Sequence, residues 1–312
     1  MANRKSKIMV VGVGLAAAVL ALPASALVTA PAEASISPKA SFSSSVFDIK
    51  VEFEGGLTTS QKAVFSAAEF FWETMITGYQ IAFTADGTNL YTGPTIKAKG
   101  AAGDGIGGVL ASAGPNTAYN VSDGTLSYAY VNTGTMTFDT NDLPGMEASG
   151  TFLDVIVHEM GHVLGFGTLW NTNSLAGFSG TQSVYTNGSG QYTGAYGLAA
   201  YNAEFGLSAT SVPVELDYGP GTANGHWDEA NFVGGSRDIM TGIINSVSGT
   251  KADAPFAAST LSATTIASFA DLGYTTTITH GIAPVPLPAG MLLSLTALAG
   301  LAGVSRRKTR AA

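Results

Sequence analysis

Residues 155–166 read VIVHEMGHVLGF and contain the pattern His-Glu-x-x-His. In an α-helix, residues four positions apart lie one above the other, so His158 and His162 can direct imidazole nitrogens at a single metal ion. Glu159 leaves the same helix toward the open side of the metal, where it can take a proton from a water molecule. The stretch therefore predicts a hydrolytic metal site. Because the bare pattern also occurs by chance, the flanking residues have to support this interpretation.

The flanking residues favour a buried helix that ends sharply. Phe152 and the apolar run 155–157 are typical of a helix beneath an active-site floor. Gly165 and Gly167 follow the pattern, and glycine tolerates the positive φ that a helix end requires. The chain can then turn and bring in a third ligand. Catalytic zinc needs one, because it takes three protein groups and keeps the fourth position for water.

The chain has four histidines, which limits the candidates for the third ligand. The compact motif His-Glu-x-x-His-x-x-Gly-x-x-His would place it at Thr168, so that version fails. His226 lies in GTANGHWDEANF, and the chain then continues to Met240 in DIMTG. His280 lies beyond the last predicted helix, where we expect a solvated histidine. A glutamate as third ligand also stays open, with three candidates, Glu204, Glu215 and Glu229.

Several motifs together resemble the leishmanolysin-like metallopeptidases: HEMGHVLGFG followed by GTLW, a histidine in HWDE, a methionine in DIMTG and the segment LSATTIASFADLGY. The resemblance covers about residues 135–274. It implies an α+β fold of the metzincin type, in which a mixed twisted sheet packs on two long helices and the zinc cleft lies below an edge strand. A C-terminal subdomain would carry the third ligand and the methionine turn.

The resemblance also implies a role for each site residue. His158, His162 and His226 would bind one catalytic Zn²⁺, Glu159 would be the catalytic base and Met240 would lie beneath the metal. The chain would then be a zinc metalloendopeptidase, with a protein or peptide as its substrate. The leishmanolysins proper are rich in cysteine, whereas this chain has none, so neither disulfides nor cysteine-based latency can be carried over.

Two other functions stay open. One is a non-catalytic metal-binding protein of the envelope or extracellular matrix, and the other is a metal-dependent hydrolase of non-peptide substrates. The presence of Glu159 argues against the first, because a scaffold has no use for a base beside two metal-facing histidines. Only the family resemblance disfavours the second.

Both ends of the chain resemble sorting signals. Residues 1–26 combine basic residues, an apolar run over 8–22 and the sequence ASA, which predicts removal by signal peptidase. Residues 280–312 contain VPLPA, an apolar run over 291–304 and a basic terminus, and they resemble the PEP-CTERM class of sorting signals. That class implies transient insertion of a C-terminal transmembrane helix in the inner membrane and cleavage by an exosortase-type transpeptidase. The alternative is a simple membrane anchor.

The predicted destination is the cell envelope or the exterior of a Gram-negative bacterium. Without the three basic residues of the first signal and the four of the second, 7 Lys+Arg remain against 22 Asp+Glu, a net charge near −15. So acidic a body argues against nucleic acid and anionic lipid as partners.

Between the two ends, residues 48–279 form the predicted catalytic domain after a serine-rich lead-in over 27–47. Sequence patterns predict strands at 48–53, 128–131 and 134–139, and helices at 59–75, 198–205 and 261–272. By the resemblance, the strand at 134–139 would be the edge strand that holds an extended substrate. Residues 172–225 are the predicted insertion between the second and third ligands, and its tyrosines are candidates for oxyanion stabilisation.

Three smaller features complete the predictions. The aromatic residues of helix 59–75 indicate a core face, namely Phe65, Phe70, Phe71 and Trp72. The sequence GDGIGG at 103–108 lacks the lysine and the following helix of a phosphate-binding loop. Asp139 and Asp142 are candidates for calcium, but their spacing matches no recognised loop, so we predict solvated acids of a turn and leave any structural Ca²⁺ unplaced.

Overall fold

The computed structural model describes residues 8–10, 17–21, 47–172, 183–244 and 256–278. The chain divides into two compact units, Met1–His280 and Gly281–Ala312, of which the second lies outside the described residues. His280, the C-terminal sorting tail and almost all of the lead-in at 27–47 also lie outside them. Within the described ranges, no helix is both long enough and apolar enough to cross a membrane.

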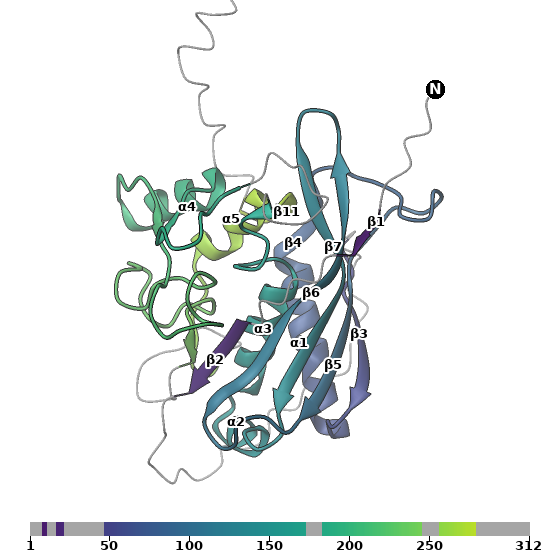
Figure 1. The fold of residues 1–312 in the computed structure, drawn as a ribbon, viewed down its shortest axis with the longest axis vertical. Coiled ribbons are helices and arrows are strands. Elements are labelled where there is room, and N and C mark those ends of the chain that lie inside the picture. Colours follow the sequence, from purple (N-terminus) through teal and green to yellow (C-terminus); the bar gives the residue numbers. More distant parts are fainter. Residues whose placement is uncertain (1–7, 11–16, 22–46, 173–182, 245–255, 279–312) are drawn as a thin grey trace, which may run out of the picture. The chain divides into compact units, whose positions relative to one another are not determined.

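The first unit is built on a mixed seven-stranded sheet (Figure 1). The strand order is β10 (Ile243–Ile244), β2 (Ala17–Ala21), β6 (Gly108–Ser122), β7 (Ser127–Asp139), β5 (Thr95–Ala101) and β3 (Lys50–Gly55), and β1 (Ile8–Val10) also pairs with β6. Strands β3, β5 and β7 are parallel, whereas β6 is antiparallel to β7. Smaller two-stranded sheets join β11 (Tyr274–Thr276) to β4 (Ile76–Tyr79) and β8 (Gln191–Tyr192) to β9 (Val212–Pro213).

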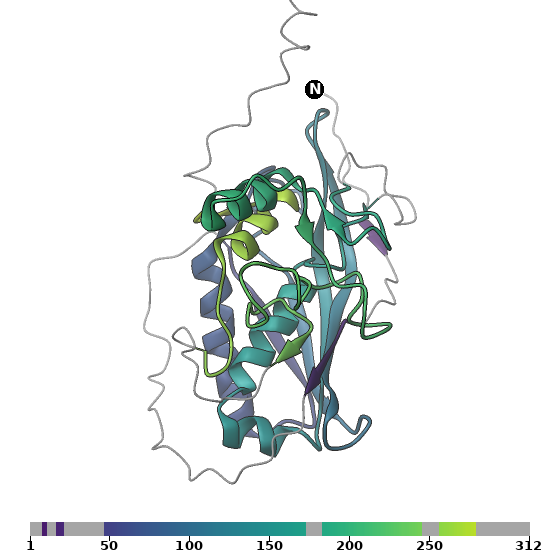
Figure 2. The ribbon, with the colours of Figure 1, turned by 90° about the vertical axis from the view of Figure 1, so that its left-hand side faces the viewer.

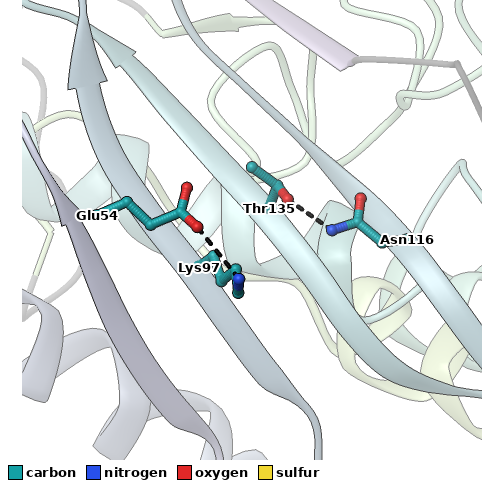
Figure 3. Close-up of polar contacts among 4 residues, drawn as sticks. All are labelled: Glu54, Lys97, Asn116 and Thr135. Carbon is teal, nitrogen blue, oxygen red and sulfur yellow. Dashed lines mark hydrogen bonds and ion pairs between the residues drawn. The ribbon is translucent and has the colours of Figure 1, made fainter.

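Side chains on neighbouring strands add contacts to the backbone ladder (Figure 3). Lys97 of β5 forms an ion pair with Glu54 of β3 at 3.2 Å between Nζ and Oε1. Asn116 of β6 donates a hydrogen bond of 2.6 Å from Nδ2 to Oγ1 of Thr135 on β7. Both are surface contacts, and exposed pairs of this kind add little to stability, so the sheet depends mainly on its ladder and its buried face.

Two helices, α1 (Thr59–Met75) and α3 (Phe152–Val163), lie side by side against one face of the sheet (Figure 2). Helix α1 begins at a capping box, in which Thr58 accepts from the backbone of Gln61 and the Gln61 side chain accepts from Thr58. Trp72 of α1 donates from Nε1 to the carbonyl oxygen of Val157 at 3.0 Å, which ties α1 to α3. The remaining helices are α2 (Leu143–Ser149), α4 (Ala195–Phe205) and α5 (Ala263–Asp271).

The described part therefore has a mixed α/β architecture with five helices, compatible with the predicted α+β class. The helix predicted at 59–75 is confirmed, and those predicted at 198–205 and 261–272 correspond to α4 and α5. The strands predicted at 128–131 and 134–139 are one continuous strand, β7.

The prediction that 134–139 is an edge strand is wrong. Strand β7 pairs with β5 on one side and with β6 on the other, so its backbone hydrogen-bonding groups are already used. Strand β6 lies one position further out and packs against α3. The short strands β1 and β2 pair with its outer edge. Among the strands that contact α3, β6 would become an edge only without β1 and β2.

The predicted surroundings of Phe70 and of two aspartates, Asp139 and Asp142, are wrong. Phe65, Phe71 and Trp72 are buried as expected, but Phe70 is 48% exposed, because it lies on the opposite side of α1 from that core face. Asp139 and Asp142 are not solvated turn acids. Both are buried, since the loop at 103–108 folds over them and donates backbone N–H groups to their carboxylates.

Candidate metal centre

The three predicted histidine ligands meet in the core of the described structure. His158 and His162 project from α3, one turn apart, and His226 comes from the loop that follows the insertion. Their Nε2 atoms lie 2.9 Å apart for His158 and His162, 2.9 Å apart for His162 and His226, and 3.1 Å apart for His158 and His226. All three side chains are fully buried.

Backbone carbonyl groups fix the tautomer of each ring. The Nδ1 atoms lie 2.6 Å from the oxygen of Ile239 for His158, 3.0 Å from that of Phe166 for His162 and 2.8 Å from that of Thr222 for His226. A carbonyl oxygen can only accept, so each Nδ1 carries the proton and each neutral ring leaves Nε2 bare.

Electrostatics keep these rings neutral. Burial lowers the pKa of His158 to about 3, with the neighbouring His226 adding to the effect, and burial also lowers the pKa of His226 to about 4. Burial and the two other rings lower the pKa of His162 well below its ordinary value. Three uncharged nitrogen lone pairs therefore face one another with no proton between them.

This arrangement fits a bound cation. Three bare acceptors at these distances repel one another, and a positive ion between them would turn the repulsion into ligation. Nitrogen ligands about 2.0–2.1 Å from a tetrahedral ion lie about 3.3–3.4 Å from one another, close to the observed spacing. The three histidines can thus hold a metal ion, and among the described residues theirs is the one cluster of three such groups close enough to do so.

Close backbone approaches bring the third ligand to the helix. Gly165 and Gly167 have φ values of 115° and 69°, so the chain turns sharply after α3, as the sequence predicts. At Gly167 the backbone lies against Gly225, the residue before His226, and a Cβ at position 167 would collide with it. Only glycine allows the two segments to come this close.

Met240 lies against helix α3, next to the residue whose carbonyl oxygen contacts His158. It is fully buried, and a Cβ at Gly161 would stand 2.8 Å from its sulfur atom, so Met240 packs directly on the bare backbone of α3 between the two helical histidines. The backbone N–H of Trp227 donates to the Met240 carbonyl oxygen at 3.0 Å. The third ligand and the methionine are thereby joined in one small unit.

Two buried aspartates that sequence reasoning missed hold this unit in place. Asp238 accepts hydrogen bonds from the Met240 N–H at 2.9 Å, the Ser262 N–H at 3.0 Å and the Thr265 hydroxyl at 2.7 Å. Asp154 of α3 accepts from three successive backbone N–H groups, those of residues 257–259. For Asp154 the signal in the sequence was an acid within the apolar run FLDVIV, because such an acid needs buried donors, whereas nothing in the sequence around Asp238 gave such a signal.

Glu159 lies on the same helix as two of the three histidines and follows His158 directly in the sequence. It is fully buried on α3 between the two helical ligands, and neither carboxylate oxygen has a hydrogen-bond partner in the described structure. Burial raises its pKa well above the ordinary value. A buried carboxyl group without partners is costly, which makes a purely structural role for Glu159 hard to justify.

The glutamates considered as alternative third ligands lie elsewhere. Glu204 accepts from the backbone of Ala263 and Thr264 and so caps α5. Glu215 accepts from the Asp217 N–H at 2.6 Å. Burial and contact with Glu215 raise the pKa of Glu229 to about 8. None of the three glutamates belongs to the histidine cluster.

Tyrosines of the insertion were candidates for oxyanion stabilisation. Tyr185 donates to Asn224 at 2.6 Å, Tyr192 donates to Asp271 at 2.8 Å, and Tyr201 accepts from the Val233 N–H at 3.2 Å. These hydroxyl groups hold the fold together, so none of the three is singled out for catalysis. No protein-family model matched the chain, and a search of curated proteins found no match either.

Proposed function

We propose that the protein is a secreted or envelope-associated zinc endopeptidase of the leishmanolysin-like, metzincin type. The observation that carries this proposal is the meeting of three bare Nε2 atoms, together with a buried carboxylate without partners, that of Glu159, on the helix that carries two of the histidines. The parallel strands β3, β5 and β7, the antiparallel β6, helix α3 and the methionine under it are all compatible with that fold.

The donor set favours zinc. Imidazole nitrogens bind several first-row metals, but three neutral histidines in a tetrahedral arrangement with one open position are typical of catalytic zinc. When bound, Zn²⁺ would acidify a water molecule, polarise the scissile carbonyl group and supply the positive charge that keeps Glu159 ionised.

The residues of the chain then divide the work. His158, His162 and His226 stay neutral because of burial and are oriented by the carbonyl groups of Ile239, Phe166 and Thr222. Glu159 takes the proton from the attacking water and passes it to the departing amine. Met240 provides an apolar support under the helix and takes no part in proton transfer.

Strand β6 is the place where an extended peptide can bind. It packs against α3, and its outer edge pairs with Ile8–Val10 and Ala17–Ala21 in the full chain. Both segments belong to the predicted signal peptide 1–26, so cleavage after residue 26 would free the edge for a substrate strand. An added strand holds a peptide straight by main-chain hydrogen bonds.

The test compares wild type with Glu159→Gln for cleavage of a denatured protein such as casein. The proposal predicts chelator-sensitive cleavage by wild type and a fall in rate of about 10²–10⁴-fold in the variant, since that is the usual contribution of a general base. Zinc content should be equal in both. Near-normal turnover by Glu159→Gln would contradict the mechanism. Bound zinc without cleavage by either protein would favour a non-catalytic metal-binding role.

A further inference from the structure

Trp227, the residue after His226, is fully buried, so its indole N–H needs an acceptor inside the protein. The Nε1 atom donates to Oγ1 of Thr265 on α5 at 2.8 Å. The backbone is extended here, because Trp227 bridges Val214 on one side and Thr241 on the other. Successive side chains of an extended backbone point in opposite directions, so one residue reaches the histidine cluster and the next reaches α5.

The hydroxyl group of Thr265 connects this indole to Asp238. An indole N–H can only donate, so Thr265 Oγ1 accepts from Trp227 and keeps its own proton for another acceptor. That proton goes to Oδ1 of Asp238 at 2.7 Å, and the Ser262 hydroxyl donates to Oγ1 at 3.1 Å. The single donor and both acceptor positions of this buried hydroxyl are therefore used.

Both ends of this hydrogen-bonded bridge, Trp227–Thr265–Asp238, lie next to residues of the metal centre. Trp227 follows the expected third ligand in the sequence. Asp238 precedes Ile239, whose carbonyl oxygen lies 2.6 Å from Nδ1 of His158. The bridge thus joins the loop that carries one histidine to the backbone group that orients another.

Aromatic packing around Trp227 cannot replace the bridge. Phe166 meets the indole ring edge-on with 5.0 Å between centroids, and Phe232 stacks on it at 5.6 Å. A stacked ring can still turn in its own plane, whereas the directional bond from Nε1 to Thr265 fixes that rotation. Without the hydroxyl group we expect the ring to stay buried while the position of His226 becomes less well defined.

We propose that Thr265 is a positioning residue of the metal centre, which holds His226 at the correct distance from the helical histidines through Trp227 and Asp238. The inference rests on the proposed metal centre but not on peptide hydrolysis. The ring nitrogens of the three histidines contact one another and backbone carbonyl oxygens, not Thr265. Any effect of Thr265 on a metal ion therefore acts through the residues to which it is hydrogen-bonded.

The test is the affinity of the full chain for Zn²⁺, measured by competition with a chromophoric chelator. Thr265→Val removes the hydroxyl group from a side chain of nearly the same shape and leaves the Trp227 N–H without its acceptor. We expect zinc binding to weaken by about 10–100-fold, the usual result of removing a group that orients metal ligands. Thr265→Ser keeps the hydroxyl group and should bind zinc nearly as tightly as wild type.

Two further measurements separate positioning from folding. Co²⁺ can replace Zn²⁺, and its visible absorption depends on the number and geometry of its ligands. At saturating Co²⁺ the spectrum of Thr265→Val should differ from that of wild type, and Thr265→Ser should restore it. Trp227→Phe removes the donor at the other end of the same bond while keeping an aromatic ring, so it should weaken zinc binding in the same way and tests the bridge even if Thr265→Val does not fold.

The matched control is Thr264→Val. Thr264 is the neighbouring residue of α5 and is also fully buried, but its hydroxyl group donates to Oε2 of Glu204 on α4 at 2.9 Å. This bond ties α5 to α4 instead of to the loop of the third ligand. Thr264→Val should lower the stability in urea unfolding to a similar extent, with the zinc affinity and the cobalt spectrum of wild type.

The outcomes distinguish this inference from the proposed function. Wild-type zinc affinity and a wild-type cobalt spectrum in Thr265→Val would overturn the inference. Equal losses of zinc affinity in Thr265→Val and Thr264→Val would do so too, because the effect would then follow from stability alone, and so would a Thr265→Ser variant as impaired as Thr265→Val. Zinc binding that depends on Thr265, without cleavage of any peptide, would contradict only the proposed function, whereas a wild type that binds neither Zn²⁺ nor Co²⁺ would overturn both.

Discussion

The two halves of the histidine centre are built in different ways. Helix α3 supplies His158, Glu159 and His162 by spacing alone, because residues four apart share one helical face. The other half, the loop unit with His226 and Met240, comes from about 70 residues further along and has almost no regular structure of its own. It is held by hydrogen bonds to Asp238 and by the Trp227 backbone. Local geometry thus specifies one half, and long-range polar contacts position the other.

Breaking the support of the loop unit should have the largest effect. In Asp238→Asn, one acceptor oxygen becomes an amide donor. The Met240 N–H donates to Oδ1 and the Ser262 N–H to Oδ2, so either orientation of the amide places a donor against a donor. We expect a loss of about 2–4 kcal/mol in the free energy of unfolding, measured by urea denaturation of the full chain, together with weaker zinc binding.

The matched control is Asp228→Asn in the same segment. Asp228 accepts from Ala230 and Asn231 near the surface, so its replacement should cost no more than about 0.5 kcal/mol. Equal destabilisation by the two variants would show that Asp238 has no special part in holding the loop unit.

A smaller effect is expected where the two halves touch. Gly161→Ala would place a Cβ 2.8 Å from the Met240 sulfur atom, and such overpacking costs about 1–3 kcal/mol. Gly145→Ala in α2 is the control: nothing lies within 4 Å of its Cβ, so removal of a flexible helical glycine should stabilise the protein slightly.

A double-mutant cycle sharpens this contact. Adding Met240→Ala to Gly161→Ala frees the space for the new methyl group, so the two changes together should cost less than the sum of the single changes. Strict additivity in thermal or urea unfolding would mean that Met240 does not press on α3.

The last effect concerns pH and the metal-free protein. Burial holds the pKa of His158 at about 3 and that of His226 at about 4, whereas an unfolded histidine titrates near 6.5. Below about pH 6.5 the unfolded chain binds protons that the native state refuses, so stability should fall as the pH drops from about 6.5 toward 4.

His226→Gln removes one of the titrating groups and isolates this effect. Its unfolding free energy should fall less steeply with decreasing pH, by at most about 1.4 kcal/mol per pH unit relative to wild type. The measurement is urea denaturation of both metal-free proteins at several pH values. If the unfolding free energy depends on pH with the same slope in both, the imidazoles are not buried and neutral.

The same division explains what could be predicted from the sequence. Helix α1 begins and ends where the capping box and the apolar pattern indicate, and the helical ligands follow from spacing. His226 could be singled out because so few histidines compete with it and because its motif resembles a known family. The partners of Asp154 and Asp238 could not be predicted, since they lie up to about a hundred residues away in the sequence.

The order of strands in the sheet and the burial of Asp139 and Asp142 could not be predicted from the sequence either. Polar and apolar residues alternate along β7, which precedes α3 in the sequence. No local pattern predicts that β6 pairs with the side of β7 opposite β5. Asp139 and Asp142 occupy an ordinary turn by composition, and only the fold of loop 103–108 over them makes them buried.

The most direct test of the central claim is the zinc content of the full chain after equilibration with Zn²⁺ and removal of free metal, for wild type beside His226→Ala. If the helix half and the loop half form one metal centre, wild type holds one zinc per chain and His226→Ala holds almost none. Zinc retained by His226→Ala would show that α3 binds metal without the loop unit, and a metal-free wild type would show that the three histidines are not a zinc site.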